Sequence, residues 1–301
     1  MAEKKMFKEI AEEWLWSRKD KVKRISYYSY ENMLHGTIFP IMGECSMDEV
    51  CKFSYMKALA RDLKEKYSDE TIDNIFNIVK CIINYDTALN MNDIGLSEKK
   101  RIYDYTFAEA RRIISQATEG NKDFKKLGIV LIMYTGMTVS EIAALKWGCF
   151  DMLGDVIVVN EIAYRAKNDY GRTEIVYEET EPRRIPIAKK LKEIIRKYKA
   201  DDVAWDSEHF VLTDSEKIME PRLFQMYVKK FFSSGYEKGE LKKIRTSNDM
   251  RSMFIVLALK RGVSPISLSH IVGTTLYYIY ERYGEYIQIP DAHREMRKLG
   301  Y

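Results

Sequence analysis

The stretch YTGMTVSEIAALKW, residues 134–147, marks a change of direction between two predicted helices. The run LGIVLIM just before it is the most apolar part of the sequence, and Thr135 and Gly136 break that run after a few turns. The segment SEIAALKW then resumes helical spacing of its apolar residues. The sequence therefore predicts a helix near 122–135, a glycine break, and a further helix through SEIAALKW.

Length and composition are typical of a globular chain with one large or two medium domains. The chain has 301 residues, of which 46% are hydrophobic and 31% charged, and no apolar run reaches the roughly 18 residues that span a bilayer. The N-terminus MAEKKMFKEIAEEW lacks an apolar signal core, so no export signal is expected. We therefore expect a cytoplasmic protein with no membrane partner.

The cysteines and histidines do not have the spacing of metal ligands. There is no CxxC, HxxxH or HExxH pattern, so we expect no metal and no disulfide frame, and the cysteines are most simply buried thiols. The net charge of +4 permits nucleic-acid binding without requiring it, because clustering of positive charge matters more than its sum. The residues concerned are Cys45, Cys51, Cys81, Cys149, His35, His209, His270 and His293.

The first part of the chain, residues 1–95, predicts a helical domain. Ser46 is a candidate N-cap within the segment IFPIMGECSMDEV, which is rich in turn-forming residues. The polar stretch NMNDIGLSEKKR, residues 90–101, is typical of a linker between domains, and the linker is predicted at 96–105. Helices are expected near 6–18, 25–37, 54–66 and 69–90.

Residues 106–285 predict a second domain, with both helices and strands. The segments DVIVVNEIAYR and RTEIVYEE are rich in Val, Ile and Tyr and flank the turn-like KNDYG, so they predict a hairpin. RRIPI is expected to be a short strand that leads into a helix, and HFVLT another short strand. Further helices are expected near 106–117, 221–232 and 247–261, and a tail follows at 286–301.

Two segments resemble boxes of the tyrosine recombinase family, the phage-integrase and Xer-like enzymes. YTGMTVSEIAALKWGCFD is similar to box I, which reads TG, a residue, Arg, a residue, SE, then L, W and D. SNDMRSMFIVLALKRGVSPISLSHIVGTTLYYIYERYGEY is similar to box II, which reads HxxR, then a Gly, an LGH and a Tyr about ten residues after that Gly. The positions in step are Gly136, Ser140, Glu141, Leu145, Trp147, Asp151, Arg251, Gly273 and Tyr283.

The resemblance implies a mainly α fold with a small β-sheet: a helical, SAM-like core-binding domain followed by an α+β catalytic domain. In the family, a tyrosine attacks a DNA phosphodiester and forms a 3′-phosphotyrosyl link without a cofactor. Two arginines clamp the phosphate oxygens, since a guanidinium donates bidentately to phosphate. A hairpin lysine acts as general acid, and two histidines, or a His and a Trp, assist proton movement and phosphate contact.

Four of the six family catalytic positions differ in this chain. The box I arginine place is Thr138, and the hairpin lysine would fall at Tyr177 to Glu179, where there is no lysine. The histidine places are Asn248 and Thr274. Removal of one oxyanion donor typically costs about 10² to 10³ in rate, so the four changes predict that efficient strand cleavage is lost. The retained positions are the expected catalytic residues, Arg251 and Tyr283.

Other readings remain open for the family's catalytic positions. Basic side chains from elsewhere could occupy the positions that lack the family residue, and the candidates are Lys167, Arg172, Arg183, Arg184 and His270. Tyr283 lies among four other tyrosines and could simply pack, and Arg251 could form a structural ion pair with Glu141 or Asp249.

Basic residues suited to phosphate contact are grouped in several segments. SRKDKVKRISYYSY opens a predicted helix, and KGELKKIRTSND precedes box II. The resemblance implies double-stranded DNA as partner, a homo-oligomer on DNA through the tail, and a partner recombinase. The expected DNA-binding residues are Arg18, Lys19, Lys21, Lys23, Arg24, Lys167, Arg172, Arg183, Arg184, Lys242, Lys243 and Arg245.

The leading hypothesis is a DNA-binding, tyrosine-recombinase-like protein of a mobile or phage-derived element. It would serve site-specific recombination or integration as an architectural or regulatory partner, with impaired catalysis. One alternative is an active integrase with a rearranged site, which forms the phosphotyrosyl intermediate through Tyr283. The other is a helical protein-interaction module that does not bind DNA.

Overall fold

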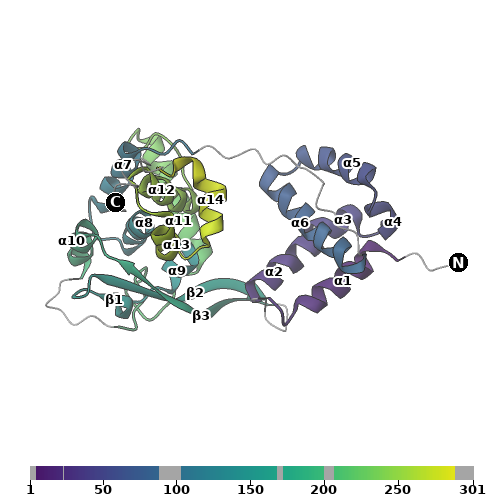
Figure 1. Cartoon of the computed structure of the whole chain (residues 1–301). Helices are drawn as coiled ribbons and strands as arrows, with labels where there is room; N and C mark the ends of the chain where they lie inside the picture. Colours follow the sequence, from purple (N-terminus) through teal and green to yellow (C-terminus); the bar gives the residue numbers. More distant parts are fainter. Residues whose placement is uncertain (1–4, 23, 88–102, 168–171, 200–206, 289–301) are drawn as a thin grey trace, which may run out of the picture. The chain divides into compact units, whose positions relative to one another are not determined.

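The computed structural model describes residues 5–22, 24–87, 103–167, 172–199 and 207–288 (Figure 1). The chain divides into two compact units. The first comprises Met1–Lys99 with Ala166–Glu174, and the second comprises Lys100–Arg165 with Ile175–Tyr301. Lys23, the side chain of Lys167, residues 168–171 and most of the expected linker and tail lie outside the described residues.

Apart from the segment Ala166–Glu174, the first unit is built from helices, as the sequence predicts. The predicted stripe of α6 is buried, from Ile72 at 2% exposed to Ile83 at 0%, and Ser68 caps the start of that helix by accepting a hydrogen bond from the Thr71 amide. The segment expected to be a turn instead contains short helices. The elements are α1 (Phe7–Arg18), α2 (Arg24–Met33), a π-helical segment (Leu34–Ile38), α3 (Phe39–Met42), α4 (Met47–Val50), α5 (Phe53–Lys64) and α6 (Asp69–Asp86).

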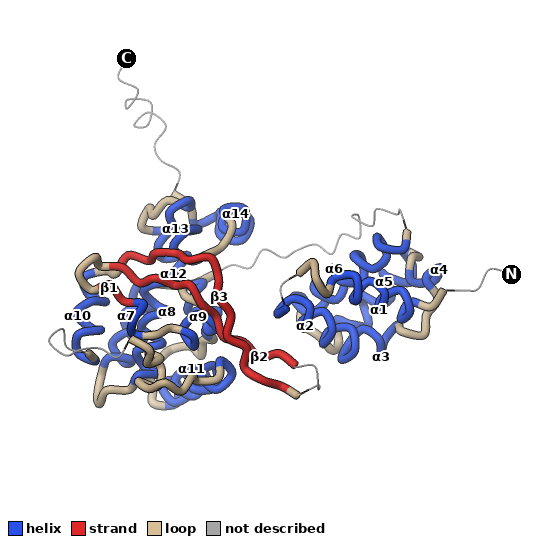
Figure 2. Tube along the Cα trace, turned by 90° about the horizontal axis from the view of Figure 1, so that it is seen from below, coloured by secondary structure: helices blue, strands red, loops and turns tan. Residues whose placement is uncertain are grey.

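The second unit packs helices against a small sheet of three strands in the order β1-β2-β3. The strand β1 pairs antiparallel with β2, and β2 and β3 form the long predicted hairpin (Figure 2). The expected strand at HFVLT is wrong, because Phe210 makes only isolated bridges to Lys146 and Ser215. The elements are α7 (Phe107–Thr118), α8 (Phe124–Thr135), α9 (Val139–Ala144), β1 (Phe150–Asp151), β2 (Val156–Lys167), β3 (Thr173–Pro186), α10 (Lys189–Tyr198), α11 (Pro221–Glu237), α12 (Ser247–Lys260), α13 (Pro265–Val272) and α14 (Leu276–Tyr283).

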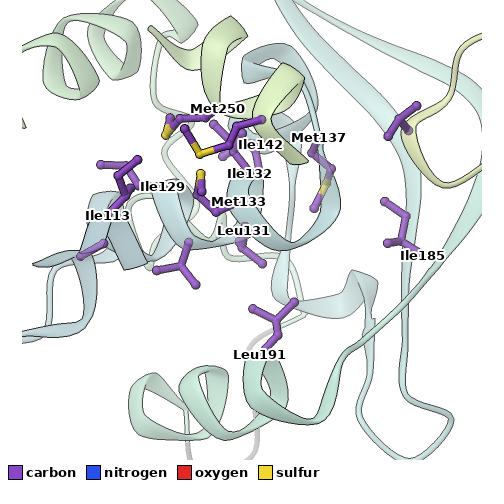
Figure 3. Close-up of a cluster of buried hydrophobic side chains, with 14 of the residues drawn as sticks. Ile113, Ile129, Leu131, Ile132, Met133, Met137, Ile142, Ile185, Leu191 and Met250 are labelled. Carbon is purple, nitrogen blue, oxygen red and sulfur yellow. The ribbon is translucent and has the colours of Figure 1, made fainter. Parts of the chain in front are cut away.

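Helix α8 is the centre of the second core. Its residues Leu127 and Ile129 through Ile132 are all 0% exposed, and a helix that is apolar on every side must be enclosed by other elements. Figure 3 shows Ile132 and Met133 of α8 gathered with Met250 of α12. No described helix has both the length and the apolar character needed to cross a bilayer.

Gly136 ends α8 in a conformation that suits glycine. Its φ of +67° lies in the left-handed region, and a Cβ there would come within 2.6 Å of the Phe254 side chain and 2.9 Å of Val272. The glycine thus lets the chain turn tightly from α8 into α9 while α12 and α13 pack against the turn. The structure places the two boxes side by side for this reason.

Candidate functional site

Arg251 lies on α12 and binds the backbone of two other segments. The helix starts with a capping box: the Thr246 amide donates to Asp249 Oδ2 at 2.9 Å, and the Asp249 amide donates to Thr246 Oγ1 at 3.1 Å. Arg251 follows in the next turn and donates through Nη1 to the Gly136 carbonyl and through Nη2 to the Val272 carbonyl, the latter at 2.8 Å. Arg251 therefore joins α12 to the ends of α8 and α13.

Arg251 does not form either of the ion pairs considered from the sequence. Among the described residues, Glu141 pairs with Arg183, and Asp249 caps α12 and accepts from the Tyr105 hydroxyl at 3.0 Å. Burial lowers the pKa of the Arg251 guanidinium below its ordinary value, Glu141 raises it, and Arg183 lowers it further. The charge of Arg251 thus lies close to those of Glu141 and Arg183.

Thr138, at the box I arginine position, is the N-cap of α9. Its hydroxyl accepts a hydrogen bond from the Glu141 amide at 3.3 Å, and its amide donates to Glu141 Oε2 at 2.7 Å. This reciprocal capping box satisfies two amides that a helix start leaves unpaired. The threonine therefore has a structural role.

Glu141 links this helix start to β3. Its Oε1 accepts from Arg183 Nη1 at 2.5 Å, and the two side chains are only 10% and 16% exposed, respectively. Burial opposes ionisation of Glu141, but the hydrogen bond and charge of Arg183 and the Thr138 amide outweigh it, so the pKa of Glu141 is lowered. Glu141 therefore stays ionised at neutral pH.

Arg183 reaches the end of α13 beside Arg251. Its Nε donates to the Ile271 carbonyl at 3.0 Å, next along the chain from the Val272 carbonyl that Arg251 binds. The guanidinium lies flat against Gly273, where a Cβ would be 2.9 Å from Arg183 Cζ. Arg183 Nη2 is buried and has no acceptor among the described residues. An unmet buried donor typically costs about 1–3 kcal/mol, and more when it is charged.

Tyr283 is enclosed by other aromatic rings. It is 2% exposed, its ring stacks on Tyr103 at 5.3 Å between centroids, and Tyr278 meets it edge-on at 6.0 Å. Its hydroxyl hydrogen-bonds the Ser252 hydroxyl at 3.0 Å. Burial raises the pKa of the Tyr283 hydroxyl well above its ordinary value, the bond to Ser252 lowers it, and Tyr278 raises it. Both burial and protonation oppose nucleophilic attack by this hydroxyl.

Tyr103 is itself held in place over Tyr283. Arg282 Nε donates to the Tyr103 hydroxyl at 3.0 Å. The Tyr286 hydroxyl accepts from the Tyr103 amide at 2.7 Å and donates to its carbonyl at 3.1 Å. The short segment before α7 thus covers the ring of Tyr283.

The other replaced positions differ in their surroundings. Thr274 is half-buried directly after Gly273, against which Arg183 lies. Asn248 is exposed in the first turn of α12, and Glu179 is exposed on β3. His270 is exposed in the last turn of α13.

The expected DNA-binding residues fall into two groups. Lys19, Lys21, Arg24, Arg172, Arg184 and Lys242 are exposed, although Arg24 pairs with Glu174. Four others are engaged within the protein: Arg183, through Glu141, and three more, of which Lys243 is itself exposed. Arg18 stacks on the Trp14 ring, Lys243 pairs with Asp104, and Arg245 binds Glu109 through Nε at 2.8 Å and Asp104 at 3.1 Å.

Sequence reasoning missed two features of this site. The cap at Thr138 is readable as the T-x-x-E pattern that precedes an apolar helix. The pairing of Arg183 with Glu141 joins residues 42 positions apart, and no local pattern indicates it.

The structure is similar to solved integrase structures along its whole length. The Tn1549 transposon integrase in complex with a circular intermediate DNA matches with a TM-score of 0.75 and 20% identity, over 98% of this chain and 99% of that chain. The same integrase with transposon right end DNA matches with a TM-score of 0.75 and 18% identity, over 99% and 100%. A lambda integrase dimer bound to a COC′ core site matches with a TM-score of 0.60 and 13% identity, over 94% and 98%.

No family model matches the chain, and no curated protein sequence matches it either. The likeness to solved structures confirms the expected fold class, a mainly helical chain with a small sheet.

We predict that Thr138→Val lowers the free energy of unfolding by about 0.5–2 kcal/mol, because the helix cap is lost while the side-chain volume is kept. Urea unfolding of the full chain measures this loss. Thr138→Ser is the matched control and should stay close to wild type, since serine retains the capping oxygen. Equal stability of Thr138→Val and wild type would contradict the capping role.

We predict that tetranitromethane nitrates Tyr277 and Tyr280 much faster than Tyr283 in the folded chain. All three lie on α14, but the first two are 72% and 53% exposed while Tyr283 is buried with a raised pKa. Nitration requires access and the phenolate, so both conditions are unfavourable at Tyr283. Peptide mass mapping gives the rates. Tyr103→Ala should speed nitration of Tyr283, and equal rates at all three positions in wild type would contradict its enclosure.

Proposed function

Because this chain has the tyrosine-recombinase fold, we propose that it binds duplex DNA through phosphate contacts and cleaves it poorly or not at all. The observation that carries the proposal is the full-length likeness to integrases whose structures contain DNA. Exposed basic residues such as Lys19, Lys21, Arg184 and Lys242 are available for such contacts. In this proposal the protein acts in site-specific recombination or integration as an architectural or regulatory partner.

The groups around the retained positions support weak or absent cleavage. Thr138 carries a neutral hydroxyl that caps α9, Glu179 is a carboxylate where a general acid would be needed, and Tyr283 is enclosed. A lysine general acid contributes typically about 10² to 10⁴ in rate. Such effects on rate are not additive within one catalytic unit. Even so, no single substitution would restore all of the missing catalytic functions.

Dimerisation through the tail and a partner recombinase that supplies missing groups remain part of this proposal. Residues 289–301 lie outside the described residues, so the proposal rests here on the family resemblance.

We predict salt-sensitive duplex binding without a covalent adduct. The substrate is a set of nicked duplexes taken from the DNA that flanks this protein's own gene. On a native gel, affinity should fall steeply as salt rises, because bound phosphates release counterions. On a denaturing gel, no protein-DNA band should form, and Thr138→Arg alone should not create one, because the general acid is still missing.

Two other results would each overturn part of the proposal. A covalent band that disappears in Tyr283→Phe would favour the active integrase with a rearranged site. Duplex affinity that is absent, or independent of salt, would favour the protein-interaction module.

A further inference from the structure

Three charged side chains meet at the C-terminal end of α13: Glu141 is buried, and the two cations, Arg183 and Arg251, are partly buried. Glu141 neutralises one positive charge of the pair Arg183 and Arg251. The end of α13 offsets roughly half an elementary charge more, because the carbonyls of a helix C-terminus carry partial negative charge. A positive excess therefore remains where burial makes charge unfavourable.

One donor of this cluster is unused. Arg183 donates through Nε to the Ile271 carbonyl and through Nη1 to Glu141, whereas its Nη2 is buried with no acceptor among the described residues. A capping role for the two arginines at α13 explains the carbonyl contacts. It explains neither the free Nη2 nor the excess charge, and both of these features would be satisfied by an anionic oxygen.

Phosphate is the anion that best suits this arrangement. A guanidinium presents planar N–H groups that match phosphate oxygens, and two neighbouring guanidiniums can hold one phosphate group. Gly273 is exposed and has no side chain, and Thr274 beside it is half-buried, so the cluster lies next to the protein surface. Because Nη2 is shielded from solvent, an incoming oxygen must displace the atoms that cover it.

We propose that Arg183 and Arg251 together bind a phosphate group of DNA, so that Arg183 of β3 supplies the second cation that Thr138 lacks. Glu141 allows Arg183 to take this role. Its Oε2 binds the Thr138 amide, and its Oε1 accepts from Arg183 and so holds the guanidinium at the start of α9. The inference rests on the proposed duplex binding. In this site the phosphate is held near the enclosed Tyr283 hydroxyl, which is protonated and hydrogen-bonded to the Ser252 hydroxyl.

The test measures binding of inorganic phosphate to the full chain by titration calorimetry at constant ionic strength. Arg183→Gln should raise the Kd for phosphate by about tenfold or more, because a charge-assisted donor pair is lost. Glu141→Gln should lower the Kd several-fold, since it removes the competing carboxylate. Its single carbonyl oxygen keeps an acceptor for the Thr138 amide or for Arg183, but not for both, because Glu141 uses one oxygen for each. A purely structural role would not move the Kd in opposite directions in these two variants.

Arg165→Gln is the control. Arg165 lies on β2 and is likewise a guanidinium paired with a glutamate, with 3.0 Å between its Nε and Glu220 Oε1. Its loss should leave the Kd for phosphate unchanged. If Arg183→Gln does not fold, Arg183→Lys keeps the charge without the fork and should still weaken binding. Phosphate binding that is absent, or equal in all variants, would overturn the site.

Duplex titrations with the same variants separate this inference from the proposed function. Weaker duplex binding by Arg183→Gln than by Arg165→Gln, with a smaller dependence on salt, supports a DNA phosphate as the ligand. Salt-sensitive duplex binding that Arg183→Gln leaves unchanged would overturn the DNA assignment while the proposed function stands. If phosphate binding depends on Arg183 but the chain binds no duplex, the proposed function is wrong and the anion site stands.

Discussion

The hydrogen bonds of Arg251 to the carbonyls of Gly136 and Val272 hold the second unit's candidate site together. They bind three segments that are far apart in the sequence: the turn after α8, the helix α12 and the end of α13. Arg183 adds a second guanidinium on the neighbouring carbonyl of Ile271 and draws in β3. Both side chains are partly buried donors that satisfy helix-end carbonyls, so the site and the fold depend on the same contacts.

Local pattern was sufficient to predict most of the helices and the hairpin. The isoleucine stripe of α6 is buried as predicted, and the Val, Ile and Tyr segments form β2 and β3. Errors arose where tertiary contacts decide. HFVLT has strand-like composition, yet Phe210 finds only isolated bridges, and Pro40 lies in the first turn of a short helix, where its missing amide costs little.

The site was only partly predictable for a similar reason. The sequence places Thr138, Arg251 and Tyr283 at positions that resemble the family boxes, and the capping pattern of Thr138 with Glu141 is local. The enclosure of Tyr283 depends on Tyr103, which is 180 residues away, and the charge excess depends on Arg183 reaching Glu141 from β3. Contacts of this range follow from the packing of whole elements rather than from spacing. In the proposed phosphate site, Arg183 of β3 supplies the cation that Thr138 does not carry, and no local pattern indicates this.

The central claim is that this chain retains a phosphate-holding site beside an enclosed tyrosine. The most direct measurement is a crystal structure of the full chain bound to a duplex. The account predicts a phosphate oxygen within hydrogen-bond distance of Arg183 Nη2 and Arg251, with the Tyr283 hydroxyl still bonded to Ser252. A phosphate that contacts neither arginine, or a Tyr283 released from Tyr103 and directed at the phosphorus atom, would contradict it.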